Sequence, residues 1–216
     1  MDATEKKLVN NDFADIMLNR HSYRKFKKDV KISDEEITQM LKESLSAPSA
    51  CNLQSWHFVV CNTPESKQKA REVMMPFNYP QVDTASTIIF VMGDIQSHYK
   101  YRDVWNKAAE NGQITTEERD KIFNTFLPLY EKADRNFLEK DATLDGSMVA
   151  MQLLLLARAH GYEANPMSGY YFDKVVPEFG LDPERYIPIT SIAIGEPDEK
   201  YTKSVRYDVN EVTDFA

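Results

Sequence analysis

The chain has 216 residues and a formal net charge of −8, with 26 basic and 34 acidic side chains. Hydrophobic residues make up 42% of it, including 11 Phe and 11 Tyr, so it can bury a substantial core and is not disordered. An acidic chain lacks the sustained basic face that nucleic acids and anionic membranes require, so neither is an expected partner. With no apolar run long enough to span a bilayer, we expect a soluble cytoplasmic protein with one domain over residues 1–216.

Apolar spacing and capping residues predict three helices in the first half of the chain. They cover 12–19, the segment from the capping box at Ser33 to Pro48, and 64–75, which opens with Thr63-Pro64. Compact runs of β-forming residues predict strands over 56–61 and 87–92, the latter closed by Gly93. A break containing Phe77 and Asn78 separates the third helix from the second strand.

The second half opens with a polar helical excursion over 96–140, in which Thr115 caps a helix that Pro128 breaks or kinks. A helix over 144–160 follows that is apolar on nearly every face, so it must be covered on every face, most easily by a second copy of the chain. The remaining predicted elements are a loop over 165–169, a helix over 172–179, a strand over 187–194 and a tail with weak strand character.

Arg20-His21-Ser22-Tyr23-Arg24 is a local basic cluster that directly follows the first predicted helix. Guanidinium forks and hydroxyls suit phosphate oxygens, so this cluster predicts an anion site. The seven glycines are widely separated, which leaves neither a Walker loop nor a G-x-G-x-x-G turn, so a phosphate would have to be held by side chains. The four histidines and two cysteines lack metal-site spacing, so we expect no metal and reduced thiols.

These pieces resemble the FMN-dependent nitroreductase family over essentially the whole chain. The resemblance depends on the order and spacing of several motifs, each weak by itself. They are Arg20 to Phe26, Ala47 to Phe58, Phe77-Asn78, Asp145 to Gly161, Pro166-Met167-Ser168-Gly169 and Ile192 to Pro197. The resemblance implies an α+β fold, with a mixed, mainly antiparallel central sheet flanked by helices, in an intertwined homodimer whose interface holds two FMN molecules.

The same resemblance implies roles for particular residues. Arg20 and Ser22 would hold the FMN phosphate with His21 beside them, while Lys203 and Arg206 would close over it from the tail. Arg24 would approach the N1/O2 edge of the flavin, where a cation stabilises the anionic reduced ring.

Other implied contacts surround the flavin ring itself. Pro48, Ser49, Ala50 and Asn52 would come from the partner subunit. Asn78 would contact the ring, and the loop of Pro166, Met167, Ser168 and Gly169 would present backbone N–H groups to N5. Two departures from the family pattern are Ser55 between Gln54 and Trp56, where a proline is usual, and the wider spacing of the tail cations.

The implied activity is a two-step transfer, in which NADH or NADPH gives hydride to FMN and a nitroaromatic, quinone or similar acceptor then takes the reducing equivalents. No side chain has to act as a nucleophile or obligatory acid. An FMN-binding storage, sensing or regulatory protein without turnover is the alternative, and a cofactor-free helical interaction module is a further one. His57, His160 and Cys51 are interpreted as structural residues.

Overall fold

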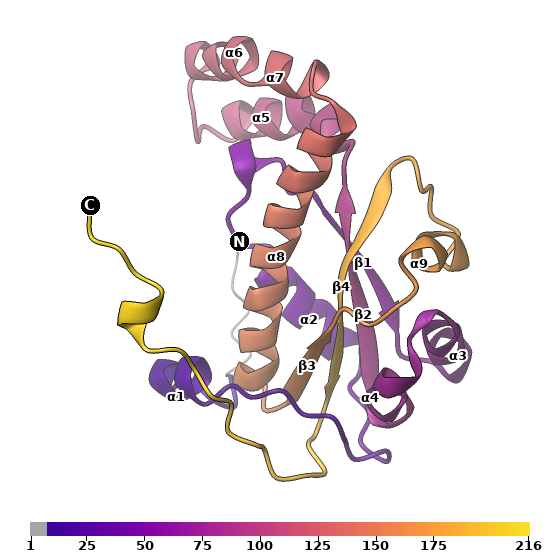
Figure 1. Cartoon of the computed structure of the whole chain (residues 1–216). Coiled ribbons are helices and arrows are strands. Elements are labelled where there is room, and N and C mark those ends of the chain that lie inside the picture. The colour runs from indigo at the N-terminus through magenta and orange to yellow at the C-terminus, as the bar shows by residue number, and fades with distance from the viewer. Residues whose placement is uncertain (1–7) are drawn as a thin grey trace.

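A computed structural model describes residues 8–216 and contains a four-stranded sheet in the order β1-β2-β4-β3 (Figure 1). The strands are β1 (Trp56–Cys61), β2 (Thr87–Asp94), β3 (Glu163–Met167) and β4 (Tyr186–Gly195). All three pairings in this sheet are antiparallel. The expected α+β class with a mainly antiparallel sheet is confirmed, and parallel pairing in the described residues is confined to an isolated bridge between Ser22 and Ala164.

The central strands are those with the most continuous apolar sequence. All eight residues of β2 are buried because helices cover both faces of the sheet. The prediction that 165–169 is a loop was wrong for its first three residues, which lie in β3. Pro166 is tolerated there because β3 is an edge strand, where a residue without an N–H group costs little.

Two helical layers enclose the sheet (Figure 1). One face is covered by α2 (Asp34–Ser44) and the long helix α8 (Arg135–Ala159), and the other by α3 (Pro64–Val73) and α9 (Phe172–Glu178). A short 3-10 turn η2 (Pro76–Asn78) and the helix α4 (Tyr79–Thr84) extend the second layer. Each layer has its own hydrophobic core, so the sheet is buried on both sides.

The helix α8 begins nine residues earlier than the sequence predicts. Asp134 caps it by accepting a hydrogen bond from the backbone N–H of Phe137, at 2.8 Å, and the polar residues that follow form its exposed first turns. Further along, Leu144, Met148 and Met151 are 42–60% exposed on the apolar helix. This face of α8 is therefore left uncovered by the chain itself.

The expected helical excursion stands beside the end of the sheet at the top of Figure 1. It contains η3 (Ser97–Lys100), α5 (Tyr101–Glu110), α6 (Thr116–Thr125) and α7 (Leu127–Glu131). A capping box between Thr115 and Glu118 begins α6, and Pro128 lies in the first turn of α7, as predicted. A small apolar cluster around Tyr101, Leu127 and Tyr130 holds these helices to Leu53.

The two ends of the described chain lie at the surface. The short helix α1 (Phe13–Leu18) leads into the basic cluster, whereas the tail runs away from the body of the molecule (Figure 1). The weak strand character predicted for the tail was wrong, because its single regular element is the 3-10 turn η4 (Val209–Glu211). Among residues 8–216, no helix is both long and apolar enough to cross a membrane.

Candidate functional site

A pocket of about 430 Å³ lies between α4, the end of β3 and the segment that follows α1. It brings together six of the predicted flavin contacts, namely Arg24, Asn78 and the four residues 166–169. Its lining comprises Arg24, Phe77, Asn78, Gln81 and residues 165–169. Residues from three separate motifs of the sequence therefore share one cavity.

Gly169 shapes the floor of this pocket. Its carbonyl oxygen accepts two hydrogen bonds, from the backbone N–H of Met75 and from Nδ2 of Asn78, each at 2.9 Å. A Cβ atom at this position would lie 2.4 Å from the ring of Phe77 and 2.7 Å from Asn78 Nδ2, so a larger residue would force both side chains to move. The backbone N–H groups of Ser168 and Gly169 have no acceptor among the described residues, which leaves two donors beside the pocket.

Gln81 is a pocket residue that the sequence analysis missed. Its side chain is 3% exposed, and its Oε1 atom has no hydrogen-bond partner within the described part of the chain. A buried acceptor without a partner costs about 1–3 kcal/mol, so this atom is suited to an N–H or O–H donor in a ligand. The helix α4 begins directly after Asn78 and places Gln81 one turn later, on the same side of the helix. The sequence analysis predicted a break around Asn78 instead of a helix, so it did not predict that the two side chains lie together.

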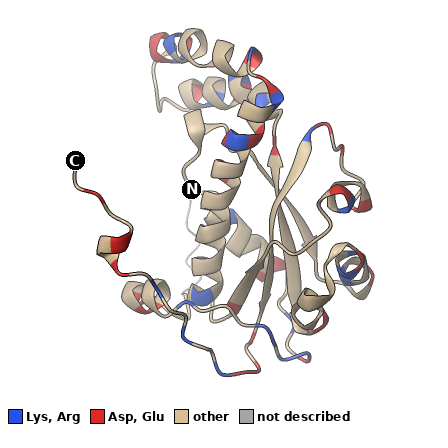
Figure 2. Cartoon of the chain, viewed as in Figure 1, with Lys and Arg blue, Asp and Glu red and all other residues tan. Residues whose placement is uncertain are grey.

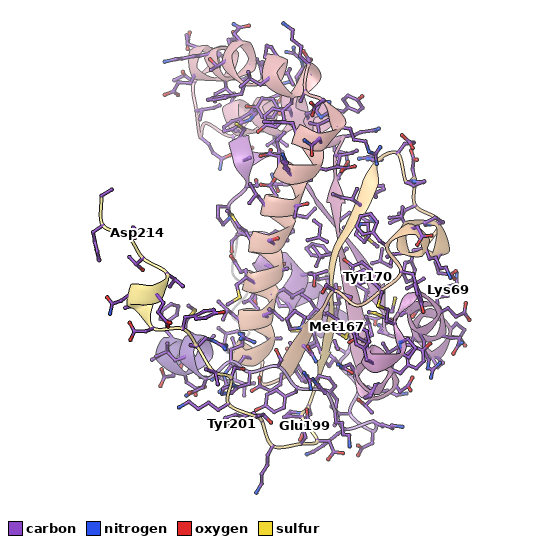
Figure 3. All side chains as sticks on the ribbon, viewed as in Figure 1. Lys69, Met167, Tyr170, Glu199, Tyr201 and Asp214 are labelled. Atoms are coloured by element: carbon purple, nitrogen blue, oxygen red, sulfur yellow. The ribbon has the colours of Figure 1, made fainter. Side chains whose placement is uncertain are left out.

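The cations of the tail meet those of the first motif at one end of the molecule. The ring of His21 stacks on Tyr201 with centroids 4.0 Å apart and planes 4° from parallel. Burial lowers the pKa of His21, and the nearby charges of Arg20, Arg158, Arg206 and Lys203 lower it further. Figures 2 and 3 show the basic residues of both segments and the crossing point at Tyr201 and Glu199.

The side chain of Glu199 holds the tail at this crossing. Glu199 accepts hydrogen bonds from the backbone N–H groups of Arg24 and Lys25, and Ser22 forms the isolated bridge to Ala164 of β3. The charges of Arg20, Lys203 and Arg206 all act on His21, so these residues and Ser22 form one basic region, which adjoins Arg24 in the pocket.

A partly buried acidic residue, Glu163, lies next to the basic region. Glu163 of β3 pairs with Arg158, which also donates to Asp15 Oδ2 at 2.8 Å. Burial raises the pKa of Glu163 to about 7, although Arg158 and Arg20 oppose that shift. Glu163 Oε2 has no partner among the described residues, so the carboxyl group is disposed to hold a proton near neutral pH.

Pro48, Ser49, Ala50 and Asn52 do not line the pocket. Their loop, with the 3-10 turn η1 (Ala50–Asn52), is bound to the middle of α8 through Asp145 and packs beside α5 and α7. Within one chain the structure thus assembles the pocket and the basic region but leaves these four predicted contacts apart from both.

A second hollow of about 790 Å³ adjoins the pocket at Ser168. Its walls come from α8, β4 and the start of α9, and they are mainly apolar, with Leu144, Tyr170, Phe172 and Ile187 among them. Lys140 and Glu139 stand at its α8 side, where Glu139 is paired with Arg135 at 2.6 Å. This groove can receive an elongated apolar molecule next to the pocket.

Comparison with known proteins gives a consistent result. The family model for the nitroreductase family matches residues 17–196. The "CLA biosynthesis enone reductase" of Lactiplantibacillus plantarum is 58% identical over 215 residues, covering 100% of this chain and 99% of that protein. The "Putative NAD(P)H nitroreductase YdgI" of Bacillus subtilis is 37% identical and covers 96% of this chain and 99% of its own length.

Solved structures agree with these relatives. The crystal structure of CLA-ER, described as an enone reductase catalysing a key step of gut-bacterial fatty acid saturation, superposes with a TM-score of 0.90 at 59% identity, covering 96% and 99% of the two chains. The crystal structure of a "putative nitroreductase in complex with FMN" from Exiguobacterium sibiricum superposes with a TM-score of 0.91 at 35% identity, covering 96% of this chain and 98% of that chain.

Proposed function

Because the chain belongs to the nitroreductase family, we propose that it is an oxidoreductase that passes reducing equivalents from NAD(P)H to a small-molecule acceptor in two successive steps. FMN is its cofactor and NAD(P)H its co-substrate, as the family, the named relatives and the FMN complex of a related structure support. The observation that carries the proposal is the pocket of Arg24, Asn78 and Gln81 beside the basic region around His21.

The residues of this chain fit FMN at both of its ends. A phosphate dianion suits the basic region, in which Arg20, Lys203 and Arg206 would bind its oxygens with Ser22 and His21 beside them. A flat heterocycle with alternating donors and acceptors suits the pocket, where Gln81 Oε1, which has no partner among residues 8–216, would accept from a ring N–H group. Asn78 and the pocket wall of Pro166 and Met167 would complete the contacts to the ring.

When bound, FMN supplies reversible hydride uptake and release at N5. The guanidinium of Arg24 would favour negative charge on the pyrimidine edge, which eases reduction. The free N–H groups of Ser168 and Gly169 would orient the ring by donating toward N5. The proposal requires no nucleophilic side chain and no obligatory acid.

A homodimer would complete the site. Pro48, Ser49, Ala50 and Asn52 lie away from the pocket of their own chain, so they would reach a flavin only from a partner copy. The uncovered apolar residues of α8 and the exposed tail support such an association, because large apolar surfaces usually mark an interface.

The acceptor we favour is an α,β-unsaturated ketone on an apolar chain, with quinones and nitroaromatics as further acceptors. The apolar groove next to Ser168 supports this, and so does the relative named as an enone reductase. Lys140 has no ion pair within the described residues and would suit a carboxylate at the end of such a chain.

The test is a visible spectrum of the purified protein followed by anaerobic turnover. We expect a yellow protein with flavin absorption bands that oxidises NADH or NADPH only when menadione, a nitrofuran or a long-chain enone acid is added. A colourless protein that cannot be reconstituted with FMN would refute the proposal. Bound flavin that neither nucleotide reduces would instead favour a storage or sensing role.

A further inference from the structure

The loop of Pro48, Ser49, Ala50 and Asn52 has an unusual backbone. Cys51, Asn52 and Gln54 have φ values of 49°, 58° and 51°, and they are the only non-glycine residues with positive φ in the described chain. Side chains with a Cβ atom rarely adopt this left-handed conformation, so three of them within four residues must be held by their surroundings.

One buried carboxylate brackets the three left-handed residues. Asp145 of α8 is 1% exposed, and its Oδ1 accepts from the backbone N–H of Ala50 at 2.8 Å while Oδ2 accepts from that of Ser55 at 3.3 Å. In the same loop, Ser49 Oγ accepts a hydrogen bond from the backbone N–H of Gln54 at 3.0 Å. Both ends of the strained segment are therefore joined to the same residue of α8.

The anchor is itself held close to the sheet. Gly146, the next residue of α8, approaches β4 so closely that an added Cβ would lie 2.1 Å from Cδ1 of Ile189. Asp145 consequently has a fixed position relative to the sheet, and its hydrogen bonds fix the position of the loop as well. Burial raises the pKa of Asp145, and its two amide bonds counteract this, as is usual for a carboxylate kept in place by hydrogen bonds.

We propose that Asp145 is a positioning residue that holds the Ser49–Ser55 loop in the shape in which it covers the flavin bound by the partner copy. This inference rests on the proposed function, since it requires a dimer in which the loop acts across the interface. Asp145 touches no flavin atom and acts only through the backbone amides of Ala50 and Ser55.

The first experiment compares Asp145→Ala and Asp145→Asn with Asp134→Ala in the full-length FMN-loaded protein. Asp134 also accepts a backbone N–H on α8, but at the exposed start of the helix, so it matches the chemistry without touching the loop. We expect the Kd for FMN to rise about tenfold in Asp145→Ala and about threefold in Asp145→Asn, which keeps one acceptor, with an altered visible spectrum of the bound flavin. Asp134→Ala should lower the melting temperature without changing either.

The second experiment mixes subunits, using two affinity tags to purify dimers of one Arg20→Ala chain and one Asp145→Ala chain. If Asp145 acts on the partner's flavin, both defects fall on the same site, and the other site is intact. The mixed dimer should then bind one FMN with wild-type affinity, which neither parent dimer does.

The possible results distinguish a failure of the role of Asp145 from a failure of the proposed function. Wild-type FMN affinity and spectrum in Asp145→Ala, or a mixed dimer with no wild-type site, would overturn the role of Asp145. A wild-type protein that is monomeric or does not bind FMN would instead overturn the proposed function on which that role depends.

Discussion

His21 is surrounded by positive charge that the sequence divides between distant segments. Arg20 is its neighbour, Arg158 comes from the end of α8, and Lys203 and Arg206 come from the tail. Burial lowers the pKa of His21 and repulsion between these like charges lowers it further, so an anion bound here would relieve that repulsion. The residues with the greatest effect on binding should be those whose charge has no carboxylate partner.

Arg20→Ala is expected to weaken FMN binding far more than folding. Losing one charge-assisted contact of about 1.5–3 kcal/mol corresponds to a rise in the Kd for FMN of about 10- to 100-fold. Titration of the apoprotein with FMN, followed by fluorescence, measures this Kd. Arg119→Ala, which removes an arginine paired with Asp120 on exposed α6, is the control and should leave the Kd unchanged. Unchanged flavin occupancy in Arg20→Ala would contradict the assignment.

The raised pKa of Glu163 should make the free energy of unfolding depend on pH. Its pKa is about 7 in the folded chain and near 4.5 in the unfolded one, so the folded state binds the proton more tightly between these values. Its contribution therefore favours folding at low pH and is lost as the pH rises through this window.

The measurement is urea unfolding of the wild type and of Glu163→Gln at pH 5 and pH 8. From pH 5 to pH 8, the free energy of unfolding should fall by about 2 kcal/mol more in the wild type than in Glu163→Gln, because the glutamine cannot ionise. Glu131→Gln, at an exposed position of α7, should keep the wild-type pH dependence. Parallel pH profiles for the wild type and Glu163→Gln would show that Glu163 is ionised throughout.

At the scale of elements, α8 connects the separate parts of the site. Its middle carries Asp145 and Gly146, its exposed apolar side offers an interface, and its last turns carry Arg158 and His160. His160 is bonded to Glu36 and Glu43 of α2, which supports the structural interpretation of this histidine. Because α8 packs on β2, β3 and β4, a change in its distance from the sheet affects the groove as well as the loop.

Gly146→Ala tests that close approach. The new Cβ would collide with Cδ1 of Ile189, at a cost of about 1–3 kcal/mol, against a gain of about 1 kcal/mol in helix propensity. We expect net destabilisation by about 1 kcal/mol in urea unfolding. Adding Ile189→Val removes the colliding atom, so the double variant should be more stable than Gly146→Ala alone. Strictly additive effects would contradict the contact.

At the scale of the whole molecule, the chain leaves surfaces that it does not cover itself. Residues 201–216 are exposed along their entire length, with Val205 94% and Phe215 96% exposed. Figure 3 shows Asp214 far from the body of the protein, in contrast to Tyr201, which lies against it. The apolar side chains of this tail alternate with charged ones, and a second copy is the surface that the proposed function provides for them.

Two truncations separate the roles of the tail. Removing 201–216 deletes Tyr201, Lys203 and Arg206 and should raise the Kd for FMN at least tenfold, while circular dichroism stays unchanged because the segment is exposed. Removing only 208–216 keeps these three residues, so it should weaken the dimer in analytical ultracentrifugation with little effect on FMN. Wild-type FMN affinity after the longer truncation would contradict the role of the tail cations.

Most elements and the motifs of the site could be predicted from the sequence, because helical spacing, capping boxes and β-forming runs are local signals. Such signals predicted the strands at 56–61, 87–92 and 187–194, the capping box at Thr115 and the basic residues at 20–24 and 203–206. Features that depend on distant partners became visible only in the folded chain. Pro166 became part of a strand because β4 pairs with it, and Gln81 faces the pocket because α4 packs beside β3's end. The Ser49–Ser55 loop holds its left-handed shape because a carboxylate about ninety residues away accepts its amides, and no local pattern reports such a bond.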